Sequence, residues 1–184
     1  MKLVIGLAGG IGSGKSMASE YLHSRYGAER LRFSQILADV LDRIHLPCDR
    51  KNLQTLGEIL RKYFGPDVVV NAFEKDLEGI NADIVVVDGL RYINEVAMLK
   101  SSENNVLIYI EAPQKTRYER SVRRAEKGEA GASFEDFLKA EQRETEKHLP
   151  EIKKAANAVI MNDGTPEGLF AKIDGILEEK KQEI

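Results

Sequence analysis

Five short apolar runs recur along the chain, and longer segments with helical periodicity separate them. The runs have the length of β-strands and lie at residues 3–7, 29–33, 83–87, 105–110 and 158–161. Those at 83–87 and 105–110 are nearly unbroken in apolar side chains, which is typical of strands buried on both faces. Alternation of such strands with helical segments predicts an α/β fold, in which helices cover both sides of a parallel sheet.

The connection after the second predicted strand is unusually long. Residues 34–81 contain three helical segments, at 35–44, 52–64 and 67–77, although a crossover between parallel strands needs only one helix. Ser34 is a residue type that can cap the first of these helices. The extra helices could merely add packing, but we expect this helical insertion to bind a second substrate.

A second long connection follows the fourth predicted strand. Residues 115–127 predict a helix dense in arginine, and residues 128–132 are rich in glycine and alanine. Ser133, with Asp136 three residues later, predicts the start of a further helix, which His148-Leu149-Pro150 should end or kink. A hinged, arginine-bearing pair of helices predicts a lid, residues 115–155, that closes over phosphates.

The loop after the first predicted strand carries the strongest chemical signal. Residues 9–16 read Gly-Gly-Ile-Gly-Ser-Gly-Lys-Ser and match the phosphate-loop pattern between the strand and the helix that this pattern requires. Glycines let backbone N–H groups approach an anion, the lysine brings a positive charge, and the serine hydroxyl can reach Mg²⁺. We therefore predict that the chain binds a nucleoside triphosphate with Mg²⁺, with Ser16 at the metal. The residues expected to hold the nucleotide are Gly10, Ile11, Gly12, Ser13, Gly14, Lys15, Ser16 and Met17.

The composition narrows the class of protein and its partners. A chain of 184 residues fits a single domain, 1–184, with core segments 1–33, 82–114 and 156–184. The net charge of −3 argues against a general nucleic-acid or membrane-surface binder. No apolar stretch approaches the ~18–20 residues of a membrane span. The single cysteine, Cys48, fits a reducing compartment, so we expect a cytoplasmic protein. We also expect a monomer or homodimer whose partner is a small molecule.

Charged residues that follow the third predicted strand supply candidate chemistry. Asp88 directly follows the apolar run 84–87. Phosphate-loop proteins need an acid at this place to hold Mg²⁺, so we expect Asp88 to share the metal with Ser16. The alternative is that Asp-Gly merely turns the chain. Arg91 should lie at the carboxyl edge of the sheet, where α/β folds bind ligands, and its planar guanidinium suits a second phosphate. A surface salt bridge to Glu95 is the alternative for Arg91.

Four arginines lie on the predicted lid helix. Spacings of three and four residues place Arg117, Arg120 and Arg124 on one face. Phosphoryl transfer spreads negative charge over the moving group, so we assign Arg120 and Arg124 to that charge, ahead of Arg117 and Arg123. A solvated helix face is the alternative. The predicted catalytic residues are thus Lys15, Asp88, Arg120 and Arg124, with Arg143 a further candidate.

Motifs along the whole chain resemble the nucleoside monophosphate kinase group of phosphate-loop proteins. Residues 6–16, the lid arginines Arg120 and Arg124, and the segment Ala-Asn-Ala-Val-Ile-Met-Asn-Asp-Gly-Thr at 156–165 resemble dephospho-coenzyme A kinases. The block Asp-Gly-Leu-Arg-Tyr-Ile-Asn-Glu at 88–95 resembles deoxynucleoside monophosphate kinases of phage type instead, as do residues 53–58 and 65–67. The chain also resembles small archaeal proteins related to adenylate kinase.

This resemblance implies a fold, a pair of substrates and their sites. The fold would be a three-layer P-loop fold with a five-stranded parallel sheet in the order 2-3-1-4-5. Adenine would lie near Arg120 and the segment that contains Asn162, Gly164 and Thr165. The acceptor would bind Ser34, Arg61 and Arg91. Dephospho-coenzyme A kinases usually have Asp-x-Asp where this chain has Phe33-Ser34-Gln35, which makes the coenzyme A precursor the second choice of acceptor.

The leading hypothesis is a Mg²⁺-ATP-dependent kinase that acts on a (deoxy)nucleoside monophosphate or a similar nucleotide-like acceptor. The alternative from another class is a switch or assembly factor that hydrolyses ATP or GTP. The guanine-binding pattern Asn-Lys-x-Asp does not occur in the chain, and an arginine-rich lid favours a kinase, because it shields the reaction from water. A relative that modifies RNA ends or a protein is a third possibility, against which the acidic balance weighs.

Overall fold

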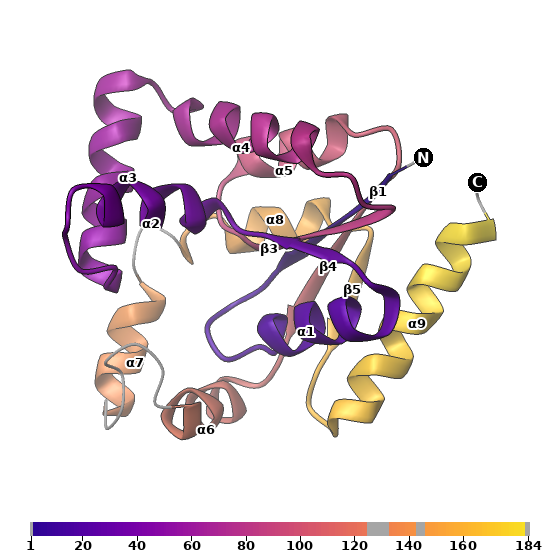
Figure 1. The fold of residues 1–184 in the computed structure, drawn as a ribbon. Coiled ribbons are helices and arrows are strands. Elements are labelled where there is room, and N and C mark those ends of the chain that lie inside the picture. The colour runs from indigo at the N-terminus through magenta and orange to yellow at the C-terminus, as the bar shows by residue number, and fades with distance from the viewer. Residues whose placement is uncertain (1, 125–132, 143–145, 183–184) are drawn as a thin grey trace.

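Five parallel strands form one sheet in the order β2-β3-β1-β4-β5 (Figure 1). The computed structural model describes residues 2–124, 133–142 and 146–182, apart from the side chains of Arg50 and Arg124. Neighbouring strands all run parallel. The α/β fold and the sheet order that the resemblance implies are therefore confirmed. The strands are β1 (Leu3–Ala8), β2 (Glu29–Leu31), β3 (Ile84–Leu90), β4 (Asn105–Glu111) and β5 (Ala158–Met161).

Helices connect the strands and cover the sheet. Three of them, α2 to α4, come from the long connection after β2, and α6 to α8 come from the long connection after β4. In chain order the helices are α1 (Lys15–Tyr26), α2 (Phe33–Arg43), α3 (Arg50–Phe64), α4 (Val68–Gly79), α5 (Ile93–Ser101), α6 (Gln114–Arg124), α7 (Phe134–Glu141), α8 (Leu149–Ala155) and α9 (Pro166–Gln182).

Successive residues of a strand point to opposite faces of the sheet, and helices cover both faces. In β1, which is buried throughout, Val4 packs in a cluster with residues of α2, α4, α5 and α8. Its neighbour Ile5 packs on the other face with residues of α1 and α9. Figure 1 shows α4 and α5 on one side of the sheet and α1 and α9 on the other. The strands read as continuous apolar runs for this reason.

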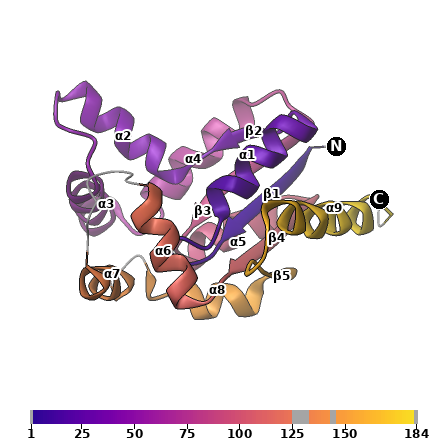
Figure 2. The same ribbon diagram turned by 90° about the horizontal axis from the view of Figure 1, so that it is seen from below.

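The carboxyl ends of the strands face a region flanked by the two long connections. In Figures 1 and 2, α2 and α3 of the first connection and α6 and α7 of the second lie at the same end of the sheet. Both chain termini lie at the opposite end. The loop between β1 and α1 therefore opens towards the two insertions. None of the helices in the described ranges is long and apolar enough to cross a membrane.

Three local expectations are wrong. Helix α2 begins at Phe33 after an extended Arg32, so Ser34 lies in the first turn and does not cap the helix. Strand β3 continues beyond Asp88 to Leu90. Its register with β1 shifts there, because Asp88 pairs with Leu7 and Leu90 pairs with Ala8. Pro150 does not end a helix but lies in the first turn of α8, where its missing N–H has no intrahelical partner to lose. The Ser133 and Asp136 capping box is confirmed.

Candidate functional site

Glycines shape the loop between β1 and α1. Gly9, Gly12 and Gly14 have φ angles of 142°, 73° and 111°, a region that side chains with a Cβ rarely adopt. A Cβ atom on Gly12 would overlap the carbonyl oxygen of Arg117, and one on Gly9 would overlap that of Ile110. The loop therefore lies tightly against β4 and α6. Its turn leads into the start of α1, where backbone N–H groups and the helix dipole favour an anion.

Lys15 is buried at the centre of this loop. Its Nζ donates hydrogen bonds to the carbonyl oxygens of Gly9 at 2.6 Å and Gly10 at 2.8 Å. Burial, together with the charges of Arg91 and Arg117, lowers the pKa of Lys15 from 10.5 to about 7, and nearby carboxylates act in the opposite direction. An anion placed beside the ammonium group would favour its charged form. The loop thus holds a lysine whose charge is incompletely balanced by the protein.

Ser16 and Asp88 are the residues that could hold Mg²⁺. Ser16 is exposed at the start of α1, and the side chain of Asp88 is 9% exposed. The Asp88 carboxylate forms an ion pair of 3.5 Å with Nε of Arg32. Within the described residues, no group of three His, Cys, Asp or Glu side chains makes a metal site by itself. A hydroxyl and one carboxylate nevertheless fit Mg²⁺, which keeps several waters and takes further oxygens from phosphates.

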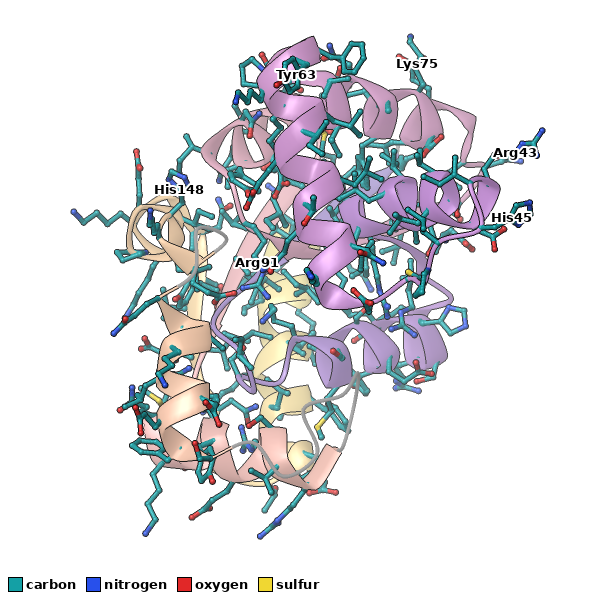
Figure 3. All side chains as sticks on the ribbon, turned by 90° about the vertical axis from the view of Figure 1, so that its left-hand side faces the viewer. Arg43, His45, Tyr63, Lys75, Arg91 and His148 are labelled. Carbon is teal, nitrogen blue, oxygen red and sulfur yellow. The ribbon has the colours of Figure 1, made fainter. Side chains whose placement is uncertain are left out.

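Arg91 lies near the carboxyl edge of the sheet, between α3 and the β1–α1 loop in Figure 3. The alternative for Arg91 was a salt bridge to Glu95, but its guanidinium does not pair with that carboxylate. Nη1 donates instead to the carboxylate of Glu146, which lies 55 residues further along the chain. The Arg91 side chain is 25% exposed, whereas that of Glu146 is 4% exposed. The guanidinium is therefore held by a buried carboxylate and keeps an open side.

Glu95 supports Arg91 through the backbone. One of its carboxylate oxygens accepts hydrogen bonds from the backbone N–H of Arg91 at 2.6 Å and of Tyr92 at 3.1 Å. Burial raises the pKa of the Glu95 carboxyl to about 7, although these hydrogen bonds and the charges of Arg61 and Arg91 act in the opposite direction. Glu95 thus fixes the turn between β3 and α5 on which Arg91 stands.

Arg61 reaches the same turn from the insertion, whereas Ser34 does not. The Arg61 guanidinium lies 4.2 Å from the ring centroid of Tyr92. The ring centroids of Tyr92 and His148 are 5.6 Å apart. Ser34 is exposed on α2, and no contact among the described residues joins it to Arg61 or Arg91. The structure therefore brings together two of the three residues expected to bind the acceptor.

Arg117, on α6, lies against the loop between β1 and α1. It donates through Nε to the carbonyl oxygen of Ala112 at 3.0 Å and through Nη1 to that of Ile11 at 3.3 Å. Nη1 also donates to the carboxylate of Glu141 on α7. The Gln114 amide donates to the same carboxylate at 2.7 Å. Arg117 therefore connects the loop, α6 and α7, a contact that the sequence analysis did not predict.

Arg120 and Asn162 connect α6, β5 and the loop. Nη1 of Arg120 donates to the carbonyl oxygen of Asn162 at 3.0 Å. The buried Asn162 amide donates in turn to the carbonyl oxygen of Ser13 at 2.8 Å. Nearby, the Thr165 hydroxyl accepts from the Gly168 backbone N–H at 3.3 Å, and Gly164 is exposed. The expected adenine segment thus lies beside the phosphate-binding loop.

Two expected arginines cannot be placed. Arg143 lies outside the described residues, as does the side chain of Arg124, although the backbone of Arg124 ends α6. Arg123 is exposed.

Sequence reasoning missed the roles of Arg32, Glu141 and Glu146. Each pairs with a site residue far away in the sequence, and no local motif signals such a partner. A partly buried arginine favours a carboxylate partner, but the chain has 30 acidic residues from which to choose.

The two hollows described on the surface lie away from this site. One of about 480 Å³ is lined by residues such as Val4 and Asn104, and one of about 660 Å³ by residues such as Gly27 and Ile84. These residues lie at or before the starts of β1, β3 and β4, or just after α1. The hollows are therefore at the amino edge of the sheet, where parallel α/β sheets do not usually bind ligands.

Known proteins are similar to this chain over nearly its whole length. A family model described as an AAA domain (AAA_18) matches residues 5–144. A UPF0200 protein of Hyperthermus butylicus is 28% identical over 96% of this chain and 94% of its own length. One of Staphylothermus marinus is 28% identical over 97% and 94%.

Solved structures share the fold at low sequence identity. TT1252 from Thermus thermophilus has a TM-score of 0.69 and 23% identity over 97% of both chains. Shikimate kinase from Acinetobacter baumannii, in complex with shikimate, has a TM-score of 0.62 and 17% identity over 98% of this chain and 96% of its own. At this identity the likeness shows a P-loop, kinase-like fold. Because the family model matches well over half of the residues, the chain belongs to the AAA domain family.

Proposed function

We propose that the protein is a Mg²⁺-ATP-dependent small-molecule kinase that transfers the γ-phosphoryl group to a (deoxy)nucleoside monophosphate or a similar nucleotide-like acceptor. The observation that supports this most is the pairing of β1 with β3, in which Ala8 lies opposite Leu90. The loop that holds Lys15 and the turn that holds Arg91 therefore leave the sheet from neighbouring strands at its carboxyl edge. Of the charged groups that act on Lys15, Arg91 has the largest effect on its pKa. Two cations on neighbouring turns suit one anion between them, and a phosphoryl group that moves from donor to acceptor is such an anion.

On the donor side, residues 10–17 would hold the phosphates of ATP, with Lys15 at the β- and γ-phosphates. Ser16 and Asp88 would hold Mg²⁺, which supplies neutralising charge to the phosphates when it is bound. Arg120 and Arg124, together with Arg117, would neutralise the transferring group. Adenine would lie beside Asn162, Gly164 and Thr165.

On the acceptor side, Arg91 would bind the acceptor anion. Arg61 would contribute from its place over the ring of Tyr92, the residue next to Arg91, and Ser34 from the exposed first turn of α2. In this proposal residues 34–81 form the acceptor-binding insertion and residues 115–155 form the lid. Phosphoryl transfer needs positioned charge more than a strong base, which this arrangement of arginines can provide.

The finer assignment within P-loop kinases rests on the motifs at 88–95 and 156–165. The first favours the nucleoside monophosphate kinase group, and the second leaves dephospho-coenzyme A as the next acceptor to consider. Shikimate is a third acceptor worth testing, because a shikimate kinase shares the fold.

An ADP-release assay with Mg²⁺-ATP tests the proposal. The panel contains nucleoside and deoxynucleoside monophosphates, dephospho-coenzyme A and shikimate. One acceptor should stimulate ADP release at least tenfold. Lys15→Ala should abolish this stimulation, whereas Arg91→Ala should raise the KM of the acceptor far more than that of ATP. Slow ADP release that no acceptor stimulates would contradict the proposal and favour an ATP-hydrolysing switch or assembly factor.

A further inference from the structure

Three segments far apart in the sequence hold Arg91 and its neighbour Tyr92. The carboxylate of Glu95 on α5 accepts hydrogen bonds from the backbone N–H groups of both residues. Arg61 on α3 lies over the Tyr92 ring. The segment just before α8 supplies Glu146 to the guanidinium of Arg91 and the ring of His148 to Tyr92. Arg91 is therefore fixed both at its backbone and at the end of its side chain.

Glu146 is buried more deeply than the Arg91 guanidinium that it binds. Its side chain is 4% exposed, whereas that of Arg91 is 25% exposed. The carboxylate accepts from Nη1, and a guanidinium has five N–H donors in a rigid fork. One side of the fork is thus bound to a buried partner, and the open side is left for a ligand.

The charge of Glu146 also reaches the donor side of the site. It raises the pKa of Lys15, in opposition to Arg91, so both residues lie within electrostatic reach of the lysine. A buried carboxylate at this point keeps two neighbouring cations in place despite their mutual repulsion. The Arg91 guanidinium is then held in place before any anion is bound.

We propose that Glu146 is a positioning residue for the acceptor: it orients the Arg91 guanidinium so that the open donors face the acceptor anion. The inference rests on the proposed function, which assigns Arg91 to the acceptor. A held fork loses less freedom when it binds a phosphate than a free side chain would.

The test measures binding rather than turnover. Inorganic phosphate is titrated by calorimetry into protein saturated with Mg²⁺-ADP, so that the phosphate-binding loop is already occupied. Glu146→Ala should weaken phosphate binding at least tenfold. Glu146→Gln should weaken it about threefold, because the amide oxygen can still accept from Nη1. The affinity for Mg²⁺-ADP should stay within twofold in both variants.

Two controls separate orientation from charge and from folding. Glu111→Gln also removes one carboxylate charge from an ion pair, with Lys153, and should leave phosphate binding unchanged. In an Arg91→Ala background, Glu146→Ala should have no further effect, whereas general damage to the fold would add to that of the first substitution. If Glu146→Ala does not fold, Glu146→Gln and its Arg91→Ala double variant carry the same test.

The outcomes distinguish this inference from the proposed function. If either Glu146 variant binds phosphate as tightly as the wild type or more tightly, Glu146 does not position Arg91, and the inference is wrong. If the wild type has no phosphate site that Arg91→Ala weakens, the assignment of Arg91 to the acceptor fails first, and the inference fails with it.

Discussion

At the scale of single residues, burial rather than motif identity sets the properties of the site. Lys15 could be predicted from the phosphate-loop pattern, because the spacing of its glycines is a local feature. Its lowered pKa could not, since the burial and the neighbouring Arg91 that cause it come from elements far apart in the sequence. The same holds for Glu146, which reaches Arg91 across 55 residues.

Nucleotide binding should take up a proton above neutral pH. The pKa of Lys15 is about 7 in the structure, so the group is mostly neutral at pH 8, and bound phosphates should restore its charge. Affinity should therefore fall with rising pH above 7, by at most about tenfold per pH unit. Calorimetry at pH 8 in buffers of different ionisation enthalpy should show uptake of nearly one proton. Lys15→Met should abolish uptake, and equal proton uptake in that variant would contradict this assignment.

Glu95 should make the protein less stable as the pH rises from 4.5 to 7. The unfolded chain releases this proton near 4.5 and the folded chain near 7, so the folded state binds more protons in between. The free energy of unfolding should fall by up to about 3 kcal/mol across this window. Urea unfolding at several pH values should show that Glu95→Gln lacks this part of the pH dependence. Identical pH profiles for the two proteins would refute the shift.

At the scale of elements, local patterns predicted the helices and strands well and their ends less well. The alternation of apolar runs identified all five strands. The expectation that Pro150 ends a helix was wrong because proline is tolerated in a first turn as well as after a last one, and the sequence offers no local means of choosing. The contact of the β1–α1 loop with α6 was also beyond prediction, because it joins Gly12 to Arg117.

Gly12→Ala should disrupt the packing of the loop on α6. The added Cβ would overlap the Arg117 carbonyl oxygen at a φ of 73°, so we expect a loss of about 3 kcal/mol of stability and at least tenfold weaker nucleotide binding. Gly27 is a matched control, with a φ of 67° and no atom within 4 Å of an added Cβ. Gly27→Ala should cost about 1 kcal/mol and leave nucleotide binding unchanged. Urea unfolding and nucleotide titration measure both effects, and equal losses in both variants would contradict this account.

Asn162→Ala should loosen the connection between β5 and the loop. Loss of its hydrogen bond to the buried Ser13 carbonyl should cost about 1–2 kcal/mol and raise the KM of ATP several-fold, with the acceptor KM unchanged. Asn157 precedes the same strand and accepts from the Leu107 backbone N–H at 2.8 Å. Asn157→Ala should lose similar stability without a change in either KM. Steady-state kinetics beside thermal unfolding would reveal a purely structural role for Asn162 if both variants behaved alike.

At the scale of the whole molecule, the order of the strands determines where the chemistry can occur. Parallel strands bring the β1–α1 loop, Asp88 and Arg91 to one edge of the sheet, and the two long connections flank that edge (Figure 1). This much could be inferred from the sequence, because alternating strands and helices permit few arrangements. The arrangement also supports the proposed kinase activity, since it brings the proposed donor site and the arginine proposed for the acceptor to one edge of the sheet.

The most direct test of that claim is the fate of the γ-phosphate. Phosphorus NMR of the protein with Mg²⁺-ATP and the acceptor that most stimulates ADP release follows every product at once. We expect ADP and a phosphorylated acceptor to form in equal amounts, with little inorganic phosphate, and Lys15→Ala to form neither. Formation of ADP together with inorganic phosphate, and of no phosphorylated acceptor, would show that the protein hydrolyses ATP and is not the kinase proposed here.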